Sequence, residues 1–152
     1  MAENKKIIGA TIVDYKGMQF RSKLELRIFK ACEELKLNPL HEPKKFVLWE
    51  GFKPTVPFYI KSKSTRQLTL EQKKQIDITY TPDIIFELPN YYVIVEVKPS
   101  FCNDVYPYKR KMFRRFLEDY SKGWSKQIVF AQIGSVKEVK ELLKILNNEG
   151  NN

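Results

Sequence analysis

Cysteine, histidine and glycine are scarce in this chain of 152 residues. The two cysteines, Cys32 and Cys102, have neither CxxC nor zinc-ligand spacing, and His41 is the single histidine. The sequence therefore argues against a structural zinc site and a disulfide framework, and we expect both thiols to be reduced. There is also no glycine-rich phosphate loop and no Ser/His/Asp set, which argues against P-loop and triad enzymes.

Long hydrophobic runs are absent as well. No run approaches the roughly 18 apolar residues that cross a bilayer, and the polar start MAENKK lacks the apolar segment of a secretory signal. Apolar residues make up 43% of the chain and charged residues 30%, which is a globular mixture. We expect a soluble, cytoplasmic protein with no membrane partner, folded as one domain over residues 1–152.

Positive charge is in excess. Lysine and arginine number 27 against 18 aspartate and glutamate residues, giving a formal net charge of +9. An excess of this size favours a polyanionic partner, although charge alone fits a merely soluble basic protein equally well.

The hydrophobic pattern predicts a mixed α/β fold. Leu24, Ile28, Ala31 and Leu35 form one stripe of a helix that begins near Phe20 and ends at Asn38-Pro39. Two further helices are expected, over Tyr108–Tyr120 and from Ser135, where Glu138 completes a capping-box spacing. Together with the strands, this order predicts a central mixed sheet flanked by helices. The expected strands cover Lys6–Val13, Lys45–Trp49, Thr55–Ile60, Ile76–Tyr80, both sides of Leu88–Tyr91, and Gln127–Ile133, whereas residues 61–75 are expected to form a basic loop.

The most strand-like segment, TPDIIFELPNYYVIVEVKP, carries charges where core residues are expected. Counting outward from Pro89-Asn90 places Asp83 directly opposite Glu96, and Lys98 on the same side as Glu96. Like charges in such a cross-strand pair destabilise a sheet. A divalent cation with oxygen ligands, Mg²⁺ or Mn²⁺, would offset the repulsion. The alternative is a half-exposed strand with solvated charges, and a bulge would shift the pairing by one residue.

Such a site has the parts for phosphodiester hydrolysis. A metal on Asp83 and Glu96 can polarise a phosphoryl oxygen and lower the pKa of a bound water, and Lys98 can stabilise developing charge. Pro82-Asp83 followed by Glu96-Val97-Lys98 resembles the PD-(D/E)xK signature of the restriction-endonuclease-like nuclease superfamily. The upstream FRSKLE resembles phage endonuclease I-type Holliday junction resolvases and related small phage nucleases, and by that match Glu25 is the third carboxylate.

The resemblance implies a function. It implies a restriction-endonuclease-like core, with Glu25, Asp83 and Glu96 as metal ligands and Lys98 as a catalytic residue. The implied activity is Mg²⁺-dependent cleavage of branched DNA in a phage or mobile element, in the host cytoplasm. It also allows a homodimer that pairs through residues 1–19. Two alternatives are the endonuclease subunit of a heteromeric transposase and an inactive nucleic-acid-binding or virion-associated module.

Several of these residues have simpler interpretations. Ser22 and Glu25 have capping-box spacing, so Glu25 would bond to backbone and carry no chemistry. His41 reads as a loop residue, and Trp49 and Trp124 as packing residues. A basic face on the second helix predicts contact with DNA phosphates, with a solvated helix face as the alternative. It comprises Lys109, Arg110, Lys111, Arg114 and Arg115.

Overall fold

The computed structural model describes residues 11–98 and 106–149 of the chain. It has a mixed α/β fold with several small sheets and divides into two compact units. Residues 1–44 and 81–152 form one, called here the core unit; residues 45–80 form the other, called the ribbon. The single nuclease domain over 1–152 stays a prediction. In the described residues, no helix has both the length and the apolar character needed to cross a membrane.

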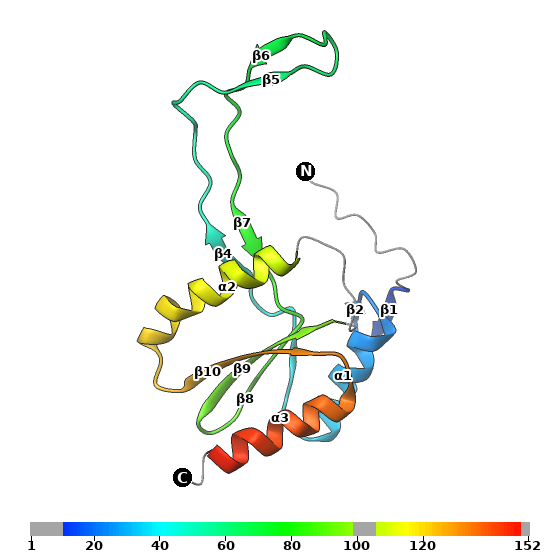
Figure 1. The fold of residues 1–152 in the computed structure, drawn as a ribbon. Helices are drawn as coiled ribbons and strands as arrows, with labels where there is room; N and C mark the ends of the chain where they lie inside the picture. The colour runs from blue at the N-terminus through cyan, green and yellow to red at the C-terminus, as the bar shows by residue number, and fades with distance from the viewer. Residues whose placement is uncertain (1–10, 99–105, 150–152) are drawn as a thin grey trace. The chain divides into compact units, whose positions relative to one another are not determined.

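The core unit is built on a four-stranded sheet (Figure 1). Its strands lie in the order β10 (Gln127–Ile133), β9 (Tyr91–Val97), β8 (Ile84–Glu87) and β3 (Leu40–His41). β10 runs parallel to β9, whereas β9 with β8 and β8 with β3 are antiparallel. The sheet is therefore mixed, as the sequence predicts.

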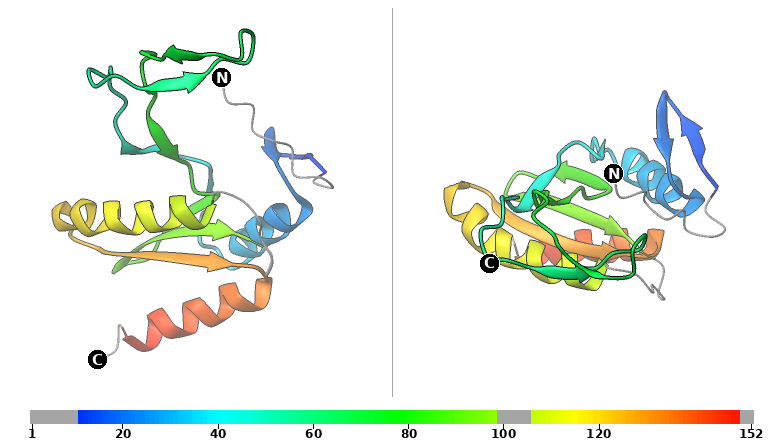
Figure 2. Two further views of the ribbon diagram at one scale, coloured as in Figure 1. Left: turned by 45° about the horizontal axis from the view of Figure 1, so that its top comes forward. Right: turned by 90° about the horizontal axis from the view of Figure 1, so that it is seen from above.

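Helices cover both faces of this sheet. Figure 2 shows α2 (Tyr106–Tyr120), followed by the short helix η1 (Ser121–Gly123), on one face and α3 (Val136–Glu149) on the other. α1 (Lys23–Glu34) joins α3 on its face, where both contribute to one apolar cluster. Every residue of β9 is buried as a result. The buried members of the cluster are Phe20, Ile28, Phe29, Cys32, Leu37, Ile84, Phe86, Tyr91, Val93, Val95, Val97, Ile133, Val139 and Leu146.

The β8–β9 hairpin has the predicted register. Ile84 pairs with Val95, and the pairs continue to Glu87 with Tyr92. Leu88 and Tyr91 close the turn through two backbone hydrogen bonds of 2.9 and 3.3 Å. No bulge interrupts the ladder, so the next pair outward is Asp83 and Glu96.

The N-terminal part differs from the prediction. β1 (Val13–Tyr15) and β2 (Met18–Phe20) form a hairpin through Lys16-Gly17, whose φ angles of 50° and 77° suit a tight two-residue turn. Phe20 thus ends a strand, and α1 begins at Lys23, after Ser22 caps it. The predicted strand Lys6–Val13 lies mostly outside the described residues. The same holds for most of residues 1–19, the segment predicted to pair two subunits.

The ribbon consists of two antiparallel legs. β4 (Phe46–Trp49) pairs with β7 (Ile78–Tyr80), and β5 (Tyr59–Lys61) pairs with β6 (Leu68–Leu70). Between these pairs, Phe52 and Gln75 exchange backbone hydrogen bonds of 3.0 and 2.8 Å. At Gly51 a Cβ would lie 2.3 Å from the Gln75 carbonyl oxygen, so only glycine allows this approach.

Two predictions in the ribbon need correction. The loop predicted over residues 61–75 is wrong at β6, because Leu68-Thr69-Leu70 is too short for its alternation to stand out among polar neighbours. The strand predicted over Thr55–Ile60 covers Tyr59–Lys61, since Pro57 cannot donate a backbone hydrogen bond.

Candidate active site

Three buried carboxylates come from three elements of the core unit. Glu25 lies in the first turn of α1, Asp83 precedes β8, and Glu96 lies near the end of β9. They are 8%, 7% and 5% exposed, and they are the only buried charged residues in the described part of the chain. Burial of a charged carboxylate is expensive unless a counter-charge is near.

Asp83 is fixed by the hairpin. Its Oδ2 accepts a hydrogen bond of 2.7 Å from the Val97 N–H, and its carbonyl oxygen accepts one of 2.8 Å from the Glu42 N–H. Burial raises the pKa of Asp83 well above its usual range, and the charges of Glu96 and then Glu25 raise it further. The bond from Val97 and the charge of Lys98 oppose this rise. The repulsion expected from the sequence is therefore present.

Lys98 lies beside Glu96. Its Nζ is 3.4 Å from Glu96 Oε1 and 4.9 Å from the centre of the Tyr106 ring. Only 16% of the Lys98 side chain is exposed, so its ammonium group is directed at the carboxylates and not into open solvent. Its backbone N–H bonds to the Ile133 carbonyl at 3.0 Å, which fixes the end of β9 against β10.

Glu25 has a capping role and lies near Asp83. Its N–H donates to Ser22 Oγ at 3.1 Å, and its Oε2 accepts from the Arg21 N–H at 3.0 Å. α3 begins in the same way, where Glu138 bonds to Ser135 Oγ and to the Gly134 N–H. Glu138 is exposed, however, whereas Glu25 is buried. Burial raises the pKa of Glu25, and the bond from Arg21 partly offsets this rise. The cap alone does not account for its burial.

The donor chemistry of the three carboxylates fits Mg²⁺ or Mn²⁺, which prefer oxygen ligands. One oxygen of Asp83 and one of Glu25 are engaged by backbone N–H groups. Across residues 11–98 and 106–149, no three His, Cys, Asp or Glu side chains converge closely enough to enclose an ion. The carboxylates thus share a neighbourhood without forming a finished coordination sphere.

His41 was expected in a loop, but the structure places it in β3 beside the site. It pairs with Ile84, next to Asp83, and its charge is among those that lower the pKa of Glu25. Its ring packs on Phe20 with centroids 4.1 Å apart, and its Nε2 is buried with no hydrogen-bond partner among the described residues. No sequence pattern indicates this position, because a two-residue strand leaves no periodicity.

The five cations of the predicted basic face of α2 have different surroundings. Arg110 donates to Gln132 Oε1 at 2.9 Å and lies over the Tyr106 ring at 5.6 Å. Gln132 pairs with Glu96 in the sheet, so the hydrogen bond to Gln132 places Arg110 on the side of α2 that faces Glu96. Lys111, Arg114 and Arg115 are exposed, and Lys109 is half-buried. Gln132 is a neighbour of the site that no local sequence pattern indicates, because the pairing of β10 with β9 joins segments far apart in the chain.

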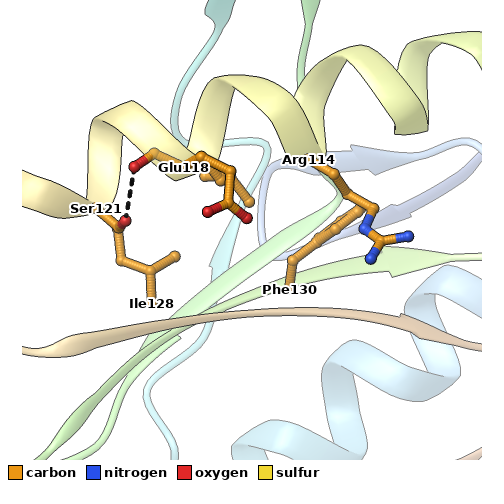
Figure 3. Close-up of a pocket in the computed structure, with 6 residues that line it drawn as sticks. Arg114, Glu118, Ser121, Ile128 and Phe130 are labelled. Carbon is orange, nitrogen blue, oxygen red and sulfur yellow. Dashed lines mark hydrogen bonds between the residues drawn. The ribbon is translucent and has the colours of Figure 1, made fainter.

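A small hollow lies between α2 and β10 (Figure 3). Its volume is about 200 Å³, and its lining includes Arg114, Glu118 and Phe130. None of the three buried carboxylates lines it, so it is separate from the acidic site.

Both tryptophans pack on another ring. Trp124 packs on Tyr92 with ring centroids 4.4 Å apart, and Trp49 packs edge-to-face on Phe52 at 5.3 Å while remaining 40% exposed. Comparison of the chain with models of protein families, with curated proteins and with solved structures finds no match.

Proposed function

We propose that this chain is a metal-dependent DNA endonuclease with a restriction-endonuclease-like core. The observation that carries the proposal is the burial of Glu25, Asp83 and Glu96 together, with the pKa of Asp83 raised by burial first and then by the charges of Glu96 and Glu25. Carboxylates with perturbed pKa values cluster at functional sites.

Each residue has a role in this proposal. Glu25, Asp83 and Glu96 would hold Mg²⁺ or Mn²⁺, which when bound polarises a phosphoryl oxygen and lowers the pKa of water. Lys98 is held 3.4 Å from Glu96 Oε1, where it would orient the attacking water and stabilise charge that develops on the phosphate. Arg110, bonded to Gln132 beside Glu96, would position a backbone phosphate. The preferred substrate is branched DNA, as the resemblance of the motifs implies.

The test is cleavage of labelled four-way junctions, linear duplex and single strands, with Mg²⁺ or with chelator. We expect Mg²⁺-dependent cutting that Asp83→Ala and Glu96→Ala each reduce by at least about a hundredfold. Glu87→Ala is the matched control, since Glu87 lies in the same hairpin but is exposed and pairs with Lys126 at 2.6 Å. It should cut as the wild type does.

Two results would contradict the proposal. Cutting that survives Asp83→Ala would reject the site, and binding without cutting under every divalent metal would favour the inactive binding module. Glu25→Gln separates the two roles of Glu25, because glutamine keeps an acceptor for the Arg21 N–H. We expect normal folding and impaired cutting from it; full activity would leave Glu25 only as a cap.

A further inference from the structure

The ribbon exposes many large hydrophobic side chains. Among the described residues, fifteen large hydrophobic side chains are exposed, and ten of them lie between Val47 and Ile76. Four of the ten are aromatic: Trp49, Phe52, Phe58 and Tyr59 are 40%, 49%, 57% and 60% exposed. Apolar side chains gathered in this way on a soluble protein indicate a binding surface.

The tip of the ribbon lacks the support that a hairpin needs. Tyr59 pairs with Leu70 and Lys61 with Leu68, so these four side chains project from one face of β5 and β6. All of them are exposed, and no third strand joins this pair in the described part of the chain. An isolated two-stranded hairpin is only marginally stable in water. A ligand that covers the exposed apolar side chains of this pair and of the residues beside it would therefore stabilise the hairpin.

Charge indicates what that ligand is. The ribbon carries three acidic residues and seven basic ones: Lys45, Lys53, Lys61, Lys63, Arg66, Lys73 and Lys74. All seven are exposed, and within the described residues none forms an ion pair. Lysine is depleted at the cores of protein–protein interfaces. Seven unpaired cations among apolar side chains therefore favour a polyanion over a protein partner.

Exposed rings among cations are the pattern that binds single-stranded nucleic acid. The cations follow the backbone, and each ring stacks on the face of a base. A fully paired duplex presents base edges and no base faces, so it would leave the rings uncovered. We infer that the ribbon binds unpaired or unstacked bases of the DNA substrate through Phe58, Tyr59 and their aromatic neighbours, with its cations on the phosphates. This inference rests on the proposed function, because it specifies which DNA the nuclease selects.

The experiment measures binding without cleavage. Fluorescence anisotropy of the wild-type chain in chelator compares a fork with unpaired arms against a fully paired duplex of equal length. The double variant Phe58→Ser/Tyr59→Ser should bind the fork at least about fivefold more weakly, because each stacked base contributes about 1–3 kcal/mol. Its binding to the duplex should not change. The control Val56→Ser/Ile76→Ser removes two more exposed apolar side chains without removing a ring, and it should bind both DNAs normally.

A charge series tests the phosphate contacts. Lys61→Gln/Lys63→Gln/Arg66→Gln should weaken binding to the fork and flatten its salt dependence. The matched control removes three exposed cations from α3, by Lys137→Gln/Lys140→Gln/Lys144→Gln, and should have a smaller effect.

The outcomes distinguish this inference from the proposed function. Ring variants that bind the fork like the wild type would overturn the inference, as would equal losses on fork and duplex. If the ring variants bind DNA normally but differ from the wild type in molecular mass in solution, the inference would be overturned, and the rings would be assigned to self-association. Ring-dependent binding to the fork by a chain that cuts no DNA would support the ribbon's role and reject the nuclease.

Discussion

At the scale of single residues, the hairpin determines the surroundings of Asp83. Its carboxylate accepts the Val97 N–H and faces Glu96, an arrangement that follows from the register of one hairpin. Its raised pKa means that the folded protein favours the protonated acid relative to the unfolded chain. The stabilisation linked to Asp83 is then complete below the ordinary aspartate pKa and is lost as pH rises through the raised value.

Asp83→Asn should therefore stabilise the chain when no divalent metal is present. Asparagine keeps an oxygen to accept the Val97 N–H and removes the charge that Glu96 and Glu25 repel. In urea unfolding at neutral pH with chelator, we expect the variant to gain on the order of 1 kcal/mol or more. The gain should shrink as pH falls towards the ordinary aspartate range. A variant less stable than the wild type at every pH would show that the charge is not the destabilising element.

At the scale of elements, the junction between β10 and α3 packs closely against the end of β9, next to the site. A Cβ on Gly134 would lie 2.8 Å from the Lys98 carbonyl oxygen, which is backbone and cannot move aside cheaply. Gly134→Ala should therefore displace the end of β9, lower the free energy of unfolding by about 1–3 kcal/mol and reduce cleavage. Thermal unfolding and the junction assay measure the two effects. Gly123→Ala, which meets no atom within 4 Å, is the control and should change neither.

The sequence predicted elements where the signal is local. The register of the hairpin was predicted by counting residues outward from its turn. The strand Gln127–Ile133 and the Ser135 cap were predicted correctly because short patterns specify them. Whole strands of two or three residues, such as β3 and β6, leave too little alternation to detect. The placing of Gln132 against Glu96 depends on a parallel pairing across α2, which no local pattern encodes. The sequence therefore predicted the register that sets Asp83 opposite Glu96, but it did not predict that His41 and Gln132 are their neighbours.

At the scale of the whole molecule, the excess of positive charge should govern DNA affinity. Lys111, Arg114 and Arg115 are exposed on α2, and a cation that contacts a phosphate releases counterions on binding. Arg114→Gln/Arg115→Gln should weaken binding to all DNA sequences alike and reduce the slope of log K against log salt by about 2. Lys140→Gln/Lys144→Gln is the control of equal charge. Identical slopes for the two variants would assign the effect to net charge and not to this face.

The ribbon begins and ends at one point, because Phe46 pairs with Tyr80. Residues between them can be added or removed without moving the two ends apart, and the entropy of closing a loop grows only slowly with its length. Evolution can therefore lengthen, shorten or replace the ribbon while the order of Glu25, Asp83, Glu96 and Lys98 in the chain stays intact. A different segment can therefore be inserted between Phe46 and Tyr80 without a change in the residues of the acidic site.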